Sequence, residues 1–329
     1  TDGNPINAHG GGLLYHNGTY YWYGEYKKGK TVLPEWATWE CYRTDVTGVG
    51  CYSSKDLLNW KFEGIVLPAV KNDPDHDLHP SKVLERPKVV YNKKTGKFVM
   101  WAHVESADYS KACAGVAVSD SPVGPFIYQG SFRPNNAMSR DQTVFVDDDG
   151  TPWMSWGNGT CFLVKLKPNM TELDGNIEIL KMPKFVEGPW IHKRENLYYL
   201  TYASMGKGRE TISYATAPSM DGPWTYRGVL TGMAENSFTI HPGIIEFKGQ
   251  NYLFYHNAIL TIDGKSGATG RRSVCVDYLY YLPDGRMAYV EQTKEGITVK
   301  PKTAAEVAEI VNLYTGEEEV VVEKEVIAE

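Results

Sequence analysis

Three acidic residues stand at the openings of apolar segments, and they are the first candidates for chemistry in this sequence. They are Glu85, Asp141 and Glu187. A carboxylate at the start of an apolar strand is costly to bury unless it faces a polar pocket. Carboxylates that converge in one pocket can exchange protons with a substrate, because burial or a like-charged neighbour raises the pKa of one of them. We therefore predict an acid–base site built from residues that are far apart in the sequence.

Cleavage of a glycosidic bond is a reaction that needs such carboxylates. One of them protonates the leaving oxygen while a second activates water or attacks the sugar. The chain is also rich in aromatic residues, with 9 Trp and 22 Tyr, which could provide flat surfaces for sugar rings. Each carboxylate taken alone also has a structural interpretation. It could cap a strand or pair with a neighbouring arginine, as Glu85 could with Arg86.

Three further polar motifs have more than one interpretation. His241, before Pro242 and Gly243, could ligate a cation, bind substrate, or be a turn residue bonded to the backbone. The pair Arg271-Arg272 follows a glycine-rich loop and could reach a sugar hydroxyl or solvate an edge strand. The loop is expected on the rim of the pocket, which favours contact with a sugar hydroxyl. The run at 147–150, Asp-Asp-Asp-Gly, begins like a calcium loop but lacks a Glu at the twelfth position, so it predicts a hairpin turn.

The elements that position these residues are repeated hairpins. A turn residue followed by an alternating aromatic strand recurs five times, beginning at Gly18, Gly96, Gly150, Asn196 and Gly249. A unit of roughly fifty residues cannot bury a face alone, so the units must pack on one another. Radial packing predicts an all-β, five-bladed β-propeller, with a β-sandwich as the alternative. In a propeller the strand openings surround one axial pocket, which is where the three carboxylates would meet.

The domain organisation follows from the pattern near the C-terminus. No Pro/Gly/Ser-rich linker divides the first 300 residues, and only Thr303–Val311 has a helical pattern. We predict one propeller domain over residues 1–302 and a short C-terminal helix and acidic tail over 303–329. The alternating Val and Glu of the tail predict either a closing strand or a disordered end.

Composition excludes several classes of partner. A formal net charge of −6, from 34 basic and 40 acidic residues, gives no basic field for nucleic acid. No apolar run approaches the roughly 18 residues needed to cross a bilayer, so we expect no membrane partner. The 5 cysteines form no CxxC pair, which argues against a disulfide framework and a zinc site. The chain begins at Thr1 without an apolar leader, so its compartment is not visible in the sequence.

Motifs across roughly residues 4–300 resemble glycoside hydrolase family 43, whose members are five-bladed propellers that act by inversion on plant cell-wall polysaccharides. In the first half, the motifs that resemble the exo-β-1,3-galactanase branch are Ile6–Gly12, Tyr20–Glu25, Cys51–Ser54, Glu85–Val89 and Gly124–Phe126. In the second half, the motifs that resemble the α-L-arabinofuranosidase and β-xylosidase branches are Thr143–Gly150, Trp156–Asn158, Glu187–Trp190, His241–Gly243 and Arg272–Cys275. The chain thus resembles a hybrid of these branches, natural or engineered.

The resemblance implies roles for the candidate residues. It makes Glu187 the general acid and Asp141 the partner that modulates its pKa and orients it. For the base, the galactanase branch offers a blade-two Glu, which Glu85 matches, or a blade-five Gln, near whose position His241 lies. In most of the family the general base is an Asp, and His9 occupies the matching position in this chain. The galactanase branch also lacks that Asp. His241 matches an axial metal or water ligand, which implies calcium or sodium at the propeller axis without making either necessary for the chemistry. The residues expected to bind substrate are His9, Glu25, Trp190, Arg271 and Arg272.

These observations together predict an inverting, exo-acting glycosidase on plant cell-wall polysaccharide, most similar to an exo-β-1,3-galactanase. An α-L-arabinofuranosidase or β-xylosidase of the same family is the first alternative. A carbohydrate-binding pseudoenzyme without a working base is the second, and a structural propeller that serves as a protein-interaction platform is the third. We expect a monomer whose partner is an oligosaccharide or polysaccharide, and the resemblance implies an extracellular or periplasmic location.

Overall fold

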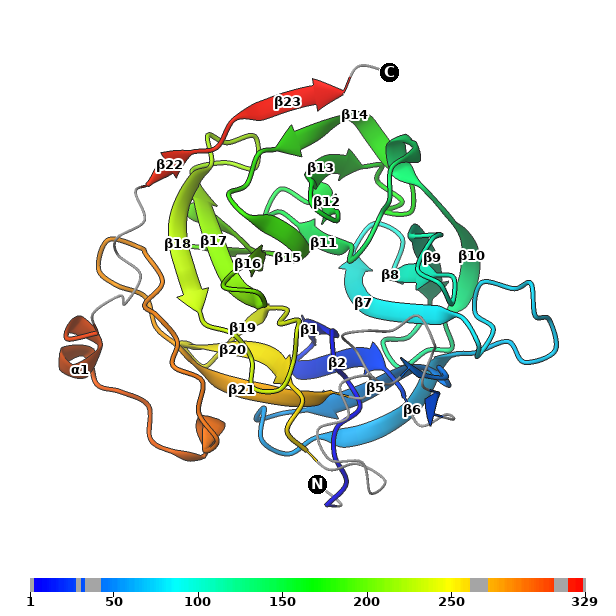
Figure 1. Ribbon diagram of the computed structural model, residues 1–329, viewed down its shortest axis with the longest axis horizontal. Helices are drawn as coiled ribbons and strands as arrows, with labels where there is room; N and C mark the ends of the chain where they lie inside the picture. Colours follow the sequence, from blue (N-terminus) through cyan, green and yellow to red (C-terminus); the bar gives the residue numbers. More distant parts are fainter. Residues whose placement is uncertain (1–2, 28–30, 33–42, 261–271, 311–318, 328–329) are drawn as a thin grey trace.

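Five small antiparallel sheets circle a central axis in the computed structural model (Figure 1). The structure describes residues 3–27, 31–32, 43–260, 272–310 and 319–327. Within each sheet the strands follow one another as hairpins, and the first strand of each sheet lies nearest the axis (Figure 1). The predicted all-β five-bladed propeller is therefore confirmed.

The first two blades contain four strands each. Blade one consists of β1 (Gly12–His16), β2 (Thr19–Glu25), β5 (Gly48–Ser54) and β6 (Lys61–Pro68). Blade two consists of β7 (Val83–Asn92), β8 (Lys97–Glu105), β9 (Cys113–Ser119) and β10 (Ile127–Phe132). Two further short strands, β3 (Thr31–Val32) and β4 (Arg43–Thr44), pair with each other inside the long connection from β2 to β5.

Blades three and four each gain a fifth strand from the end of the chain, whereas blade five has three strands. Blade three consists of β11 (Thr143–Val146), β12 (Pro152–Trp156), β13 (Cys161–Leu166), β14 (Leu173–Leu180) and β23 (Lys324–Ile327). Blade four consists of β15 (Phe185–Arg194), β16 (Leu197–Met205), β17 (Glu210–Ala217), β18 (Thr225–Thr231) and β22 (Val320–Val321). Blade five consists of β19 (Gly243–Phe247), β20 (Gln250–Asn257) and β21 (Ser273–Leu279).

Tight turns set the register of these hairpins. Asn17 and Gly18 join β1 to β2 with φ values of 48° and 73°, the left-handed pair that a two-residue hairpin loop needs. The run at 147–150 forms the turn between β11 and β12, where the Asp147 N–H donates to the Thr151 carbonyl over 2.9 Å. That run is therefore a hairpin turn, as predicted, and not a calcium loop.

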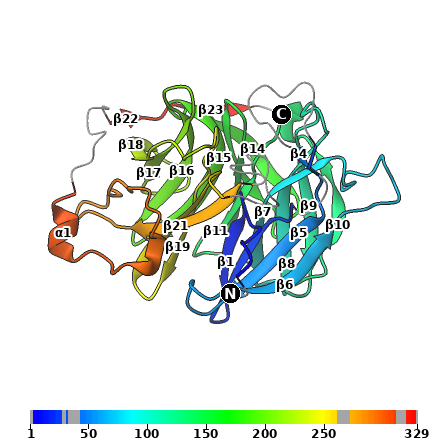
Figure 2. The same ribbon diagram turned by 60° about the horizontal axis from the view of Figure 1, so that its bottom comes forward.

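Apolar side chains between neighbouring blades hold the ring closed. Trp22 of blade one meets Phe254 of blade five edge to face, with ring centroids 4.9 Å apart. Comparable apolar clusters join blades one and two, two and three, and three and four. Because each blade buries both of its faces against its neighbours, the inner strands β1, β7 and β11 are fixed side by side near the axis (Figure 1, Figure 2).

The C-terminal segment differs from its prediction in helix length. The α-helix α1 covers only Ala304–Ala308, capped by the Thr303 hydroxyl, which accepts the Glu306 N–H. It buries no residue and lies outside the ring (Figure 1), so packing does not extend it. After it, β22 and β23 form strands on blades four and three rather than a disordered end. Two short 3₁₀ segments are η1 (Pro134–Asn136) and η2 (Gly296–Thr298), and no helix in the described residues has the length and apolar character of a membrane span.

Candidate active site

The inner strands bring the three predicted carboxylates to the hub of the propeller. Glu85 lies on β7, Asp141 two residues before β11, and Glu187 on β15. Asp141 is 3% exposed and Glu85 is 6% exposed, whereas the Glu187 side chain keeps 13%. Asp141 and Glu187 each have a carboxylate oxygen within 4.8 Å of the other. The convergence expected from the strand openings is thus present, with Glu187 the most accessible of the three.

Asp141 is held by basic side chains on both of its oxygens. Its Oδ1 lies 3.4 Å from Arg86 Nε and 3.5 Å from His103 Nδ1, and its Oδ2 lies 3.6 Å from His241 Nδ1. Burial and the neighbouring Glu187 would raise the pKa of Asp141, but Arg86, His103 and His241 outweigh them and lower it. Asp141 is therefore a fixed, ionised carboxylate beside Glu187.

Glu85 is also ionised. Tyr109 Oη donates to its Oε1 over 3.0 Å, Lys27 Nζ lies 3.5 Å from the same oxygen, and His103 Nδ1 lies 3.6 Å from Oε2. Burial would raise the pKa of Glu85, but Lys27, His103 and Arg86 lower it well below its ordinary value. A carboxylate that stays ionised can accept a proton, although strong hydrogen bonding makes it a weaker base.

His103 on β8 connects the two ionised carboxylates. Its Nδ1 faces Glu85 and Asp141, and its Nε2 lies 3.4 Å from Oε2 of Glu105. Burial would lower the pKa of His103, but hydrogen bonds to these three carboxylates raise it well above 6.5. An imidazolium therefore offsets part of the negative charge that the fold gathers here.

Glu187 is oriented by one side chain on each oxygen. His241, two residues before β19, has Nε2 at 3.0 Å from Oε1, and Asn158 Nδ2 donates to Oε2 over 3.1 Å. Gly188 makes the first contact possible, because its φ is +61° and a Cβ there would lie 2.6 Å from His241 Nδ1. Burial and Arg86 lower the pKa of His241 well below 6.5, so its ring is neutral.

His9, Glu25 and Arg272 are brought together, but in the wall of the hub. His9 Nδ1 lies 3.0 Å from Glu25 Oε2, and Lys27 Nζ lies 2.8 Å from the same oxygen. Arg272 Nη1 contacts His9 Nε2, and because a guanidinium can only donate, His9 Nε2 accepts and Nδ1 carries the hydrogen. Burial and Arg272 lower the pKa of His9 well below 6.5. Both nitrogens of a neutral His9 are thus engaged inside the protein.

Trp190 and Arg271 are the other two residues that we expect to bind substrate. Trp190 on β15 is 9% exposed and packs in the apolar cluster that joins blades one, four and five. Arg271 lies outside the described residues. Contact with substrate stays a prediction for all five residues. The four that the structure describes are largely buried: His9, Glu25, Trp190 and Arg272.

A cation at His241 also stays a prediction. Asp141, Glu187 and His241 place one possible ligand atom each within 4.8 Å of one another. Calcium prefers six to eight oxygen ligands, about 2.3–2.6 Å away. This set instead includes an imidazole that is already bonded to Glu187 and a carboxylate 3.4 Å from Arg86. The donor set of these three residues therefore does not fit calcium.

Sequence reasoning missed several residues of this site. His103 and Glu210 lie within apolar strands, Lys27 follows a strand end, and Tyr109 lies in a loop. Each acts on a partner from another strand or blade, so its role is not visible in its own segment. The usable signal is a charged or imidazole side chain inside an otherwise apolar run, as in the segment 99–104 around His103.

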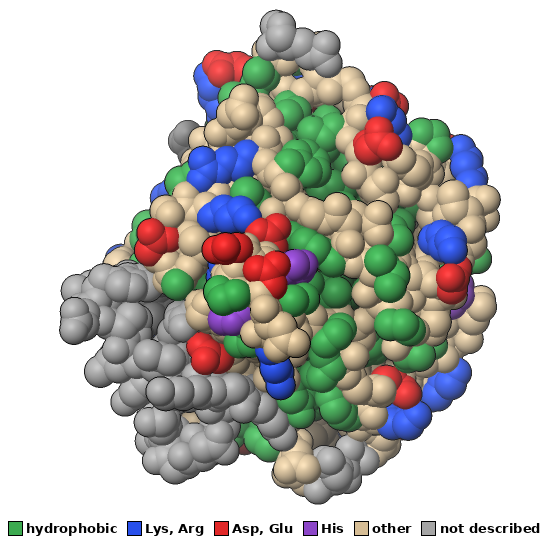
Figure 3. All heavy atoms as spheres, turned by 90° about the vertical axis from the view of Figure 1, so that its right-hand side faces the viewer, with side chains coloured by type: hydrophobic (Ala, Val, Ile, Leu, Met, Phe, Trp, Pro, Cys, Tyr) green, Lys and Arg blue, Asp and Glu red, His purple; other side chains and the backbone are tan. Residues whose placement is uncertain are grey.

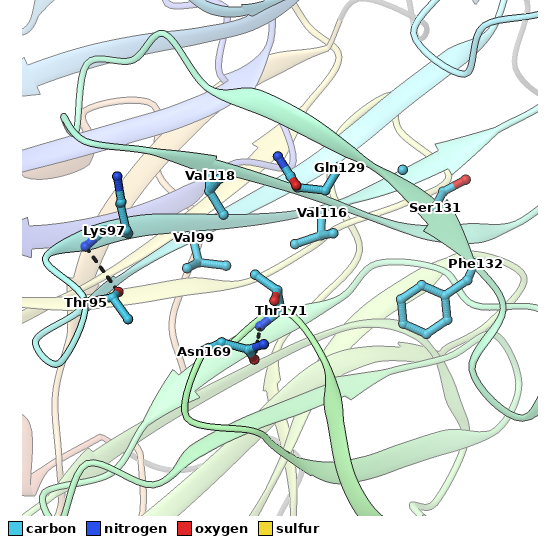
Figure 4. Close-up of a pocket in the computed structure, with 11 residues that line it drawn as sticks. Thr95, Lys97, Val99, Val116, Val118, Gln129, Ser131, Phe132, Asn169 and Thr171 are labelled. Atoms are coloured by element: carbon cyan, nitrogen blue, oxygen red, sulfur yellow. Dashed lines mark hydrogen bonds between the residues drawn. The ribbon is translucent and has the colours of Figure 1, made fainter.

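A separate hollow lies between blades two and three (Figure 4). Its volume is about 580 Å³, and its lining includes Val99, Val116, Phe132, Asn169 and Thr171. None of its lining residues belongs to the carboxylate cluster, and Lys97 is the single charged residue among them. We assign no chemistry to this hollow.

Acidic, basic and apolar side chains are mixed on one face of the surface. On the face shown in Figure 3, basic side chains are scattered among acidic and apolar ones and do not gather into one field.

Comparison with known proteins identifies the family to which the chain belongs. Residues 13–287 match the model of glycosyl hydrolases family 43. The chain belongs to family 43. The predicted resemblance is therefore confirmed, and with it the assignment of the chain to the glycoside hydrolases.

Relatives in family 43 have several different substrates in their names. The chain is 25% identical over 306 residues to a β-D-galactofuranosidase of Aspergillus niger, with 82% of this chain and 87% of that protein covered. It is 27% identical over 293 residues to an arabinoxylan arabinofuranohydrolase of Bacillus subtilis, with coverages of 75% and 55%. Among solved structures, an exo-β-1,3-galactanase from Clostridium thermocellum matches with 31% identity and a TM-score of 0.67, over 87% of this chain and 62% of that one.

The chain thus covers only 55% of the length of the arabinofuranohydrolase and 62% of the length of the galactanase. Two further relatives are named as extracellular proteins. One is an endo-α-(1→5)-L-arabinanase of Bacillus subtilis, and the other is an exo-α-(1→5)-L-arabinofuranosidase of Cellvibrio japonicus.

Proposed function

We propose that this chain is an inverting, exo-acting glycosidase that releases galactose from β-1,3-linked galactan. The observation that carries this proposal is the hub itself, where Glu187 and the ionised Asp141 have carboxylate oxygens within 4.8 Å and Glu85 shares His103 with Asp141. Inverting and retaining glycosidases both use a pair of carboxyl groups in different protonation states, and we take inversion from the resemblance to the family.

Glu187 acts as the general acid in this scheme. Its side chain is the most exposed of the three carboxyl groups, so it can reach the glycosidic oxygen. The ionised Asp141 has a carboxylate oxygen within 4.8 Å of Glu187, and we take it as the partner that orients the acid. Once the proton has moved to the leaving oxygen, His241 and Asn158 can donate to the new carboxylate.

Glu85 acts as the general base. It is held ionised by Lys27 and His103, and it accepts a hydrogen bond from Tyr109. The family resemblance places an Asp at the position of His9 in most members, but His9 has both nitrogens engaged by Glu25 and Arg272. Glu85 is therefore the better candidate to take a proton from the attacking water.

A galactan substrate is favoured over an arabinose- or xylose-containing one by two points. His9 replaces the Asp that the arabinofuranosidase and xylosidase branches use, and the locked His9 leaves the base role to Glu85 as in the galactanase branch. The structural match at 31% identity is to a protein named as an exo-β-1,3-galactanase. An arabinofuranosidase is the second candidate, supported by the relative at 27% identity that is named for arabinoxylan.

A substrate panel tests this proposal. The purified chain is incubated with β-1,3-galactobiose and with the nitrophenyl glycosides of α-L-arabinofuranose, β-D-xylose and β-D-galactose. We expect galactose from the disaccharide and little release of arabinose or xylose. Preferential release of arabinose or xylose would assign the second candidate, and calorimetric binding of galactobiose without release of galactose would indicate a pseudoenzyme.

The remaining expectations concern the setting of the protein. We propose that the partner is an oligosaccharide or polysaccharide and that the protein works outside the cytoplasm, as the extracellular names of two relatives suggest. The monomeric state is also a proposal, and size-exclusion chromatography with light scattering measures it.

A further inference from the structure

Glu210, the first residue of β17, is a buried carboxyl that has no part in the proposed acid–base scheme. Its side chain is 1% exposed, and its Oε2 accepts the N–H of Ile240 over 3.0 Å. The same oxygen lies 3.5 Å from His241 Nε2. A buried carboxyl is costly unless it is hydrogen-bonded, so the bond from Ile240 fixes where Glu210 lies, and His241 Nε2 packs against the same oxygen.

His241 Nε2 faces a second carboxyl at shorter distance, the Oε1 of Glu187 at 3.0 Å. One ring nitrogen therefore contacts both glutamates, and His241 is the residue through which Glu210 meets Glu187. Ile240 and His241 are adjacent in the chain, so Glu210 contacts both the backbone and the ring of one short segment. That segment leads directly into β19 and sets the direction of the ring.

The charge state of Glu210 suits a positioning role. Burial and the neighbouring Glu187 raise the pKa of Glu210 well above its ordinary value. A neutral Glu210 adds no third negative charge beside Asp141 and Glu187 and keeps its hydrogen-bonding atoms. Its side chain should then be replaceable by the neutral, isosteric Gln.

We propose that Glu210 is a positioning residue for the general acid: it holds the ring of His241 against Glu187 and so keeps the Glu187 carboxyl aimed at the glycosidic oxygen. This inference rests on the proposed role of Glu187. Displacement of a catalytic group by about 1 Å can cost on the order of 100-fold in rate, so a positioning residue of this kind has a measurable effect.

The first part of the test compares three substitutions of Glu210. Glu210→Ala and Glu210→Leu remove the polar atoms, and Leu retains most of the volume if Ala destabilises the fold. We expect both to lower kcat on β-1,3-galactobiose by about 10- to 100-fold with KM changed less than about threefold. Glu210→Gln should stay within about threefold of wild type. Equal losses for Gln, Ala and Leu, or no loss for Ala and Leu, would overturn the proposal.

Glu246 offers a matched control. Its Oε1 also accepts a backbone N–H, that of Gly249, but it lies at the exposed end of β19 outside the carboxylate cluster. Glu246→Ala should leave kcat and KM unchanged. Thermal melting and galactose binding by calorimetry show whether each variant retains its fold and its pocket.

The second part separates failure of this inference from failure of the proposed function. Loss of general acid catalysis matters less for a nitrophenyl leaving group, which departs without protonation. If Glu210 acts through Glu187, Glu210→Ala should be less impaired on nitrophenyl galactoside, and Glu187→Ala/Glu210→Ala should be no slower than Glu187→Ala. A multiplicative loss in the double variant would overturn the role of Glu210. An undiminished rate in Glu187→Ala alone would instead overturn the proposed general acid.

Discussion

Removal of the charge on Asp141 should move the pH dependence of the reaction in a direction that the geometry determines. Asp141→Asn keeps the size of the side chain but removes a negative charge that lies within 4.8 Å of a carboxylate oxygen of Glu187. At an effective dielectric constant of about 20, two unit charges at that distance repel each other by about 3.5 kcal/mol. Arg86 and His103 offset part of this charge, so the net repulsion is smaller than that figure.

The sign follows from which form of the acid reacts. A general acid must hold its proton, and a nearby negative charge helps it to do so. Without that charge the acid loses its proton at lower pH, so the basic limb of the kcat/KM profile on β-1,3-galactobiose should move to lower pH. The maximum rate should fall as well, because His103 and His241 lose an ionised partner.

The assay is galactose release measured from pH 4 to 9 for wild type, Asp141→Asn and a control, Asp149→Asn. Asp149 is a carboxylate of the exposed β11–β12 turn that accepts the Thr151 N–H over 2.8 Å. Its removal should leave the profile in place. A basic limb that stays put in Asp141→Asn, or moves to higher pH, would show that Asp141 does not act on the acid through its charge.

Three further predictions concern other parts of the hub. Glu85→Gln should lower kcat on galactobiose by about 100- to 10,000-fold, and azide, which needs no base, should restore part of the rate on nitrophenyl galactoside; no loss would remove Glu85 as the base. Burial and Arg86 lower the pKa of Lys88 to about 7. Because the unfolded chain binds the extra proton between about pH 7 and 10.4, Lys88 lowers stability most below pH 7 and less as pH rises. Lys88→Met should therefore melt higher than wild type at pH 6 and keep a smaller advantage at pH 9, whereas a constant difference would contradict the buried charge. Gly188→Ala places a Cβ 2.6 Å from His241 Nδ1 at a φ of +61° and should lower the free energy of unfolding by about 1–3 kcal/mol, measured by urea titration; an unchanged midpoint would contradict the close approach.

The propeller could be predicted because its signals are local and repeated. Turns such as Asn17-Gly18 and the aromatic strands after them occur five times, and each is set by residues close in sequence. The helical pattern that starts at Thr303 overestimates the length of the helix, since α1 has a capping box but no buried face to extend it. The pattern of the tail does not choose between strand and disorder, because its pairing with β14 and β18 depends on distant edges.

The candidate site was only partly predictable. Glu85, Asp141 and Glu187 could be found because a carboxylate before an apolar strand is unusual in any fold. Their charge states could not, since these depend on partners such as His103 and Lys27 that come from other strands. Glu85 is the clearest case: burial alone would raise its pKa, yet its neighbours lower it.

The anomer of the first product is the most direct test of the central claim, which is that Glu187 and Glu85 act on opposite sides of one glycosidic bond. Proton NMR during the first minutes of hydrolysis of β-1,3-galactobiose distinguishes α- from β-galactose before mutarotation mixes them. We predict that α-galactose appears first, because water attacks opposite the leaving group in a single displacement. Initial release of β-galactose would mean a covalent intermediate, and it would contradict the roles of Glu85 as general base and Glu187 as general acid of an inverting reaction.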